Sequence, residues 1–142
     1  MTKRVVTVPV DESFPRIVKL LIKKRISGAP VVDKRGNVVG VISEKDLFYK
    51  LFPSQKKFYR NLRFYMNYDN IFNEAKKVSK YKAKNLMSKK VISITPDAHI
   101  LKACSIFLTK NIRRLPVIEN GKLVGIVTTN NIYKNFLSNL VE

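Results

Sequence analysis

The sequence of 142 residues contains no tryptophan, one cysteine and one histidine. Its single thiol, Cys104, cannot form an internal disulfide, which is typical of a protein from a reducing compartment. One histidine, His99, and one cysteine do not supply the three or four ligands that a zinc site needs. We therefore expect neither a disulfide nor a metal site to hold this chain together.

Long apolar runs and catalytic groupings are also missing. No apolar run approaches the roughly 20 residues that a membrane-spanning helix needs, and the first residues lack the apolar segment of a signal peptide. The sequence shows no nucleophile–base pair, no paired carboxylate site and no Gly-rich phosphate loop. These absences predict a cytoplasmic protein that is not an enzyme, has no catalytic residues or cofactor, and does not enter a membrane.

Acidic residues are few, at 10 against 28 lysines and arginines, so the formal net charge is +18. Such a charge attracts polyanions, namely nucleotides, nucleic acid or an acidic protein. The alternative is compositional drift, because charge alone specifies no partner. The hydrophobic content of 45% is ordinary for a folded globular protein.

The chain contains an internal repeat. Residues 1–32 align without a gap with residues 87–118, and the match continues after one extra residue near Arg35. Aspartate, proline and glycine coincide in register, as Asp11/Asp97, Pro30/Pro116, Gly36/Gly121 and Gly40/Gly125. Chance rarely produces such a set of matches, so the sequence predicts two copies of one structural unit.

Each copy has the pattern β-α-β-β-α, which predicts an α+β fold. Asp11 and Asp97 are expected to cap the first helices, and the last helices are expected to start near Glu44 and Thr129. A three-stranded sheet with both helices on one face leaves its other face bare, so two copies can cover each other sheet to sheet. The first strands are expected at residues 4–8 and 90–94 and the hairpin turns at 34–37 and 120–122.

The repeated motifs resemble a known family. "PVVDKRGNVVGVISEKD" and "RRLPVIENGKLVGIVT" are similar to the motifs of a tandem pair of CBS (cystathionine-β-synthase) domains, also called a Bateman module. The resemblance implies one CBS domain at residues 1–51 and a second at 84–142, packed sheet to sheet about a pseudo-twofold axis. A basic and aromatic helical linker, residues 52–83, joins them.

The resemblance also implies a function. Relatives are regulatory, energy-sensing modules that bind AMP, ADP, ATP or similar adenosine compounds in the cleft between the two copies, and they pair into homodimers. The resemblance therefore implies an adenine nucleotide as ligand, a homodimer, and a separate protein partner that receives the signal. A dimerisation module that holds no ligand is an alternative.

Ser43 and Asp46 carry the ribose side of the implied site. Their spacing places the serine at the start of the last helix of the first copy and the aspartate one turn inside it, so both side chains point at one spot. A carboxylate there can accept both hydroxyls of a ribose diol. The alternative is that the two residues form only a helix cap.

Arg113 and Arg114 precede the buried strand of the second copy, where relatives place a cationic residue against the ligand phosphate. Arginine suits this role because its guanidinium binds phosphate in a bidentate manner and stays charged. The alternative is a pair of surface arginines. The resemblance further implies that Val41 and Ile42, with Ile92 from the other copy, sandwich the base.

The second motif departs from the family pattern. It ends in Asn131 where the family usually has aspartate, and an amide is a weaker, neutral acceptor. The first copy has Ser27 and Gly28 at the positions of the two arginines. We expect a second site built from Ser27, Thr128 and Asn131 to be weak or empty.

The stretch from Ser54 to Lys90 mixes aromatic residues with 11 basic and two acidic ones. Its apolar spacing predicts helices at about 56–66 and 70–80. Cations interleaved with aromatic rings are typical of single-stranded nucleic acid binding, so a nucleic-acid-binding adaptor is the alternative function. A linker that packs its rings on the module or across a dimer explains the same pattern.

Overall fold

The structure is a computed structural model that describes residues 3–52 and 54–141. Its chain divides into two compact units. The N-terminal unit comprises Thr7–Lys34 and Val39–Lys90, and the C-terminal unit comprises Met1–Val6, Arg35–Val38 and Val91–Glu142. Each unit contains most of one repeat.

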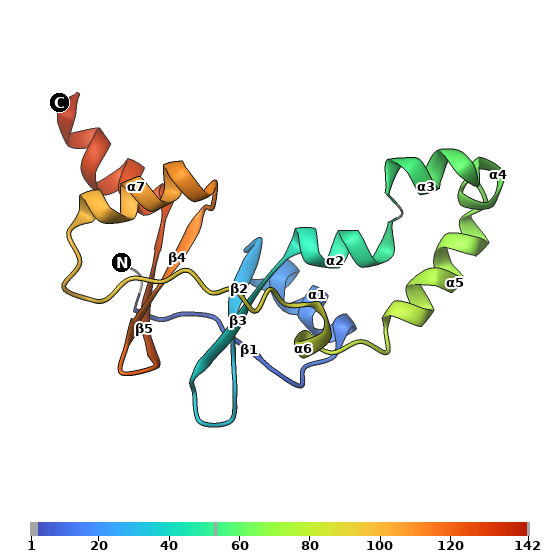
Figure 1. Ribbon diagram of the computed structural model, residues 1–142, viewed down its shortest axis with the longest axis horizontal. Coiled ribbons are helices and arrows are strands. Elements are labelled where there is room, and N and C mark those ends of the chain that lie inside the picture. The colour runs from blue at the N-terminus through green and yellow to red at the C-terminus, as the bar shows by residue number, and fades with distance from the viewer. Residues whose placement is uncertain (1–2, 53, 142) are drawn as a thin grey trace. The chain divides into compact units, whose positions relative to one another are not determined.

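The N-terminal unit contains a three-stranded sheet with the order β1-β2-β3. It is built from β1 (Val8–Pro9), α1 (Phe14–Lys24), β2 (Gly28–Val32), β3 (Val38–Ser43) and α2 (Glu44–Leu51) (Figure 1). Strands β1 and β2 are parallel and therefore need a crossover connection, which α1 supplies. This order confirms the β-α-β-β-α pattern of the first copy.

The core of the N-terminal unit lies between its sheet and its helices. Helix α1 contributes Phe14, Ile17 and Leu21, whose spacing of three and four residues places them on one face. The sheet contributes Val8, Val31 and Ile42, which are fully buried. Burial of each such side chain stabilises the fold by about 1.5–3 kcal/mol.

The region after α2 is helical but more broken than the sequence predicts. It contains α3 (Gln55–Arg60), α4 (Leu62–Tyr65), α5 (Tyr68–Val78) and α6 (Ala83–Leu86). The helix expected at 56–66 is interrupted at Asn61, whose backbone (φ −124°, ψ 47°) is not helical. The second expected helix is present as α5, beginning and ending two residues earlier than predicted.

The end of this region packs on the N-terminal unit. Val78, Ala83 and Leu86 are buried in its core, and the unit extends to Lys90. Ser88 then pairs with Val41, because each backbone N–H donates to the carbonyl oxygen of the other residue (2.9 and 3.0 Å). The first residues of the second repeat therefore extend the sheet of the N-terminal unit beyond β3.

The C-terminal unit contains α7 (Ile100–Lys110), a hairpin of β4 (Arg114–Glu119) and β5 (Lys122–Thr128), and α8 (Thr129–Ile132). A π-helical turn, η1 (Tyr133–Leu137), and a 3₁₀ turn, η2 (Ser138–Leu140), follow α8. The hairpin turns at Asn120 and Gly121, which both have positive φ (53° and 78°), as a tight Asn-Gly turn requires. The core of the C-terminal unit contains Ile94, Ala103, Phe107, Leu115 and Val117.

Two local predictions were wrong. The first strands are shorter than expected: β1 has two residues, and of the strand expected at 90–94 only Ile94 forms a bridge, with Val117. The first helices begin two residues later than predicted, so their N-caps are Ser13 and His99 rather than the aspartates.

The two aspartates make other contacts. Asp11 forms an ion pair with Lys84 (3.2 Å). A hydrogen bond from Thr95 lowers the pKa of the Asp97 carboxyl. His99 caps α7 because its Nδ1 accepts a hydrogen bond from the backbone N–H of Leu101 (3.1 Å). The predicted starts of the last helices, at Glu44 and Thr129, are confirmed.

Gly40 yields the first testable prediction, because the chain crosses it closely. A Cβ at this position would lie 2.4 Å from Met87 Sδ and 2.9 Å from the Ser88 carbonyl oxygen. We expect Gly40→Ala to lower the free energy of unfolding by about 1–3 kcal/mol through overpacking. Urea denaturation measures this loss. Adding Met87→Ala to Gly40→Ala should relieve only part of the clash, since the Ser88 backbone stays in place. An unchanged midpoint in Gly40→Ala would contradict this close approach.

Candidate functional site

The start of α2 holds Ser43 and Asp46 together. Asp46 Oδ2 accepts a hydrogen bond from the Ser43 backbone N–H (2.8 Å) and lies 3.2 Å from Ser43 Oγ, which donates to it. Both residues are half-buried. The alternative interpretation, a helix cap, is therefore correct as a description of Oδ2.

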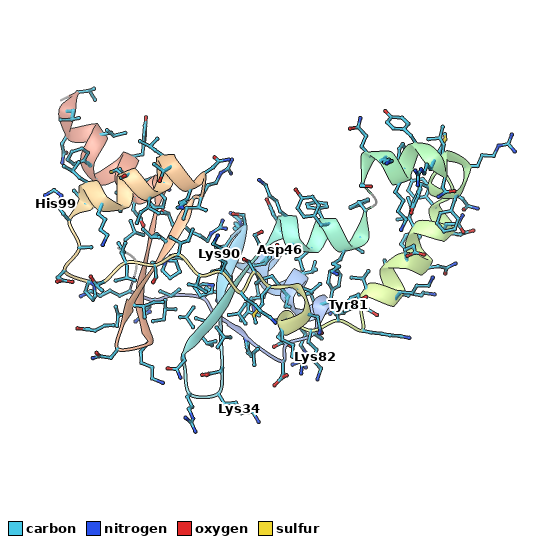
Figure 2. The ribbon with its side chains drawn as sticks, in the orientation of Figure 1. Lys34, Asp46, Tyr81, Lys82, Lys90 and His99 are labelled. Carbon is cyan, nitrogen blue, oxygen red and sulfur yellow. The ribbon has the colours of Figure 1, made fainter. Side chains whose placement is uncertain are left out.

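The second carboxylate oxygen of Asp46, Oδ1, takes no part in the helix cap. Within the described part of the chain, Ser43 is the sole hydrogen-bond partner of the Asp46 carboxylate, and both bonds end on Oδ2. Oδ1 thus keeps its acceptor capacity, while the cap fixes the orientation of the carboxylate. A single side chain can in this way start the helix and still accept a ligand hydroxyl. Figure 2 labels Asp46 at the α2 end of the sheet.

Ser27 lies beside this helix start. Its carbonyl oxygen accepts a hydrogen bond from the backbone N–H of Glu44 (2.9 Å). The same contact recurs in the C-terminal unit, where the Arg113 carbonyl oxygen accepts from the Thr129 backbone N–H (3.0 Å). In each unit, therefore, the residue that directly precedes a strand (β2 or β4) contacts the first turn of the last helix (α2 or α8).

The second copy repeats the cap with an amide. Asn131 Oδ1 accepts from the Thr128 backbone N–H (3.0 Å), and Thr128 Oγ1 accepts from the Asn131 backbone N–H (3.1 Å). The geometry of the cap survives the change from carboxylate to amide. What changes is the charge and the accepting strength of the side chain.

The two helix starts differ in charge. The first turn of α2 carries Glu44 and Asp46, whereas the first turn of α8 carries no acidic residue. The residue that precedes the strand is the neutral Ser27 before β2 in the first copy and the exposed cation Arg113 before β4 in the second. Arg114 is half-buried and engaged in an interaction of its own. One copy offers negative acceptors and the other offers positive donors.

The apolar residues of the candidate site are placed unequally. Val41 and Ile92 are half-buried, and Ile92 packs against the core of the C-terminal unit. Ile42 is fully buried in the core of the N-terminal unit, so its side chain is not available to a base. We therefore leave Ile42 out of the ligand contacts that we propose below.

An apolar groove between α1 and α2 was not foreseen from the sequence. It has a volume of about 480 Å³ and a lining that is almost entirely apolar. Ile22 of α1 is 72% exposed there, and Phe48 of α2 is also exposed. A signal was present in the sequence, because Val18, Leu21, Ile22 and Arg25 share one helical face. The same face also contributes Leu21 to the core.

Neither a metal site nor a membrane-spanning helix is found among the described residues. No group of three or more His, Cys, Asp or Glu side chains is arranged to hold a metal ion in residues 3–52 and 54–141. In the same ranges, no helix has the length and apolar character to cross a bilayer.

Comparison with known proteins shows the family. A model of the CBS domain matches residues 1–52 and 83–138. This chain belongs to the CBS domain family. Protein MJ1426 of Methanocaldococcus jannaschii is 33% identical over 138 residues, which cover 89% of this chain and 82% of that protein. The recognition of a tandem CBS pair from the sequence is thus confirmed.

Solved CBS-pair structures share the fold. The crystal structure of CBSX2 from Arabidopsis thaliana superposes with a TM-score of 0.79 at 25% identity, covering 100% of this chain and 94% of that one. A crystal structure of CBSX2 in complex with AMP gives a TM-score of 0.73 at 26% identity, covering 99% and 94%. The predicted α+β CBS-pair architecture is confirmed by these neighbours.

Sequence coverage varies among relatives. The full chloroplastic CBSX2 protein is 30% identical over 125 residues, which cover 82% of this CBS-pair chain but 52% of that protein. The chain thus spans about half the length of that relative. The family model also leaves out residues 53–82 of this chain, so the helices α3 to α5 lie outside the part that the family defines.

Proposed function

We propose that this CBS pair is a regulatory module that binds an adenine nucleotide of the AMP, ADP or ATP type and passes the signal to a separate protein. Asp46 of the first copy accepts the ribose hydroxyls, and Arg113 and Arg114 of the second copy bind the phosphate. The observation that carries the proposal is the Asp46 carboxylate, which is oriented through Oδ2 while Oδ1 has no partner within the described residues. The AMP complex of CBSX2 supports the choice of ligand.

The ribose contact follows from the hydrogen-bonding capacity of a carboxylate. Two hydroxyls of a ribose are donors, and an ionised carboxylate is the strongest acceptor that a side chain offers. A hydrogen bond to a charged group stabilises a complex by about 1.5–3 kcal/mol. Since the cap already orients Asp46, little rotamer entropy is lost when the ligand binds.

The phosphate contact follows from the charge of the second copy. Arg113 is exposed, and no acidic residue stands in the first turn of the adjoining helix. A guanidinium binds a phosphate through two parallel hydrogen bonds and remains charged at any physiological pH. Val41 and Ile92, both half-buried, supply apolar surface for the base.

The second site is proposed to be weak. Asn131 Oδ1 already accepts a hydrogen bond from the Thr128 backbone N–H, and an amide oxygen is neutral. Ser27 offers no cation at the position equivalent to Arg113. A nucleotide that used Ser27, Thr128 and Asn131 would therefore lack both the charged acceptor and the charged donor.

Regulation requires that the nucleotide bind one state of the module more tightly than another. The proposed role is non-catalytic, because the site offers acceptors and cations for binding but no nucleophile with an adjoining base.

Calorimetric titration with AMP and adenosine tests the ligand assignment. Asp46→Asn should weaken both ligands about 10- to 100-fold, which corresponds to the loss of one charged hydrogen bond. Arg113→Gln should weaken AMP by about tenfold or more and leave adenosine unchanged, because adenosine has no phosphate.

Two controls accompany this titration. Asp46→Asn should keep the start of α2, since Asn131 forms the same cap with an amide, and circular dichroism checks this. Asn131→Ala should leave AMP affinity close to that of the wild type. Equal affinity of the wild type and Asp46→Asn for both ligands would contradict the ribose assignment. Equal losses of AMP and adenosine in Arg113→Gln would contradict the phosphate assignment.

We also propose that the module forms a homodimer, with the α1–α2 groove of one copy covered by a second copy of this chain. The groove is apolar, and Ile22 is largely exposed in it. Exposed apolar surface of this kind is characteristic of an interface. The pairing of relatives that the family resemblance implies favours a second copy over another partner.

Sedimentation analysis tests the dimer with two variants that each lower the charge by one. Ile22→Glu places a carboxylate in the groove and should yield a monomer, because an unpaired charge is costly to bury. Lys23→Gln changes the neighbouring residue, which does not line the groove, and should leave the dimer intact. A dimeric Ile22→Glu variant or a monomeric wild type would rule out this interface.

A further inference from the structure

The helices α3 to α5 form an insert that the CBS family model does not cover. We call residues 54–82 the basic-aromatic insert. In Figure 1 it forms an arm of short helices that is joined to the end of α2 and returns through α5. Its residues belong to the N-terminal unit, so its contacts with α2 are defined.

One side of the insert packs on the end of α2. Phe58, Tyr65 and Ile71 are half-buried and surround a small cavity with Leu51 and Phe52. The rings of Phe58 and Tyr65 lie 6.1 Å apart between centroids. The explanation that the linker packs its rings on the module is therefore correct for this inner side.

The outer side of the insert is not explained by packing. Tyr59 is 66% exposed and Tyr68 is 77% exposed, and Phe72 is exposed as well. These rings do not contribute to the core of the N-terminal unit. These three aromatic rings thus remain largely open to solvent, although aromatic side chains gain most from burial.

Exposed cations stand near these rings in the sequence, two before Tyr59 and two between Tyr59 and Tyr68. Residues 54–68 contain four basic and no acidic side chains, and all four are exposed: Lys56, Lys57, Arg60 and Arg63. Among the described residues, none of the four forms an ion pair, whereas Lys77 and Lys84 do. Their charges are therefore available to an anionic partner.

We propose that the outer side of the basic-aromatic insert binds single-stranded nucleic acid. The four cations contact phosphates, and bases stack on Tyr59, Tyr68 and Phe72. Single-stranded nucleic acid needs this combination, since its backbone is anionic and each base has a face that stacks on an aromatic ring. The strong positive charge of the whole chain assists the encounter.

An anionic membrane fits the same composition less well. A helix that lies in a membrane surface presents a continuous apolar face along its length. Here α3 has six residues and α4 has four, with a break at Asn61, and one aromatic residue of each helix, Phe58 and Tyr65, is turned to the cavity beside α2. Separate rings flanked by cations match separate bases better than they match a lipid layer.

Fluorescence anisotropy with a labelled single-stranded oligonucleotide of about 15 nucleotides tests the proposal. Binding should weaken with salt with a log–log slope of about −3, as four phosphate contacts predict for a single strand. The double variant Arg60→Gln/Arg63→Gln should weaken binding and make this slope shallower by about one. Lys19→Gln/Lys23→Gln on α1 removes the same charge outside the insert and should change the slope less.

Stacking is tested separately from charge. Tyr59→Ala and Tyr68→Ala should each weaken binding by about fivefold to 100-fold, whereas the phenylalanine variants should bind like the wild type. Tyr49→Ala is the matched control, because Tyr49 is 79% exposed on α2 but lies outside the insert. Unchanged binding in both alanine variants, or equal effects of the two charge pairs, would overturn the proposal.

Two further measurements separate this proposal from its alternatives. Sedimentation with vesicles that contain anionic lipid should show no binding that depends on Tyr59 and Tyr68; such binding, without oligonucleotide binding, would identify a membrane surface and overturn the proposal. AMP titration of the tyrosine variants should match the wild type, because Asp46 lies at the start of α2 and the insert packs at its end. The proposal for the insert and the proposal for the nucleotide site can thus be contradicted independently of each other.

Discussion

The hydrogen bond from the Ser43 backbone N–H to Asp46 Oδ2 is the interaction on which the proposed site depends. It satisfies a backbone donor that the helix itself leaves without a partner, and a negative group at this end also favours the helix dipole. Because one oxygen suffices for this, the carboxylate is held in place with its other oxygen available. Stability of the helix start and readiness for a ligand therefore have the same physical origin.

Duplication then allows the two copies to differ in charge while they keep one backbone design. Both copies contain the helix cap. In both, a backbone carbonyl oxygen just before a strand, that of Ser27 or Arg113, accepts a hydrogen bond from the first residue of the last helix. The side chains at these positions decide the chemistry. In the function that we propose, the carboxylate of one copy accepts the sugar hydroxyls and the arginines of the other bind the phosphate.

Much of this arrangement could be predicted from the sequence because the repeat fixes it twice. The starts of the last helices, at Glu44 and Thr129, were predicted from coinciding motifs. The caps of the first helices were not, because Asp11 and Asp97 compete with Ser13 and His99 two residues later, and all four can accept a hydrogen bond. The break at Asn61 was not predicted, because the insert lies between the two repeats and has no second copy for comparison. The sequence also did not distinguish the aromatic rings of the insert that pack inward from those that stay exposed.

The central claim is that Asp46 accepts the ribose hydroxyls of an adenine nucleotide. Its most direct test is to titrate the wild type and Asp46→Asn with AMP and with 2′,3′-dideoxy-AMP, which lacks both hydroxyls. The account predicts that the wild type binds AMP about 10- to 100-fold more tightly than the dideoxy compound, and that Asp46→Asn scarcely distinguishes the two. Equal binding of both compounds by the wild type would contradict it.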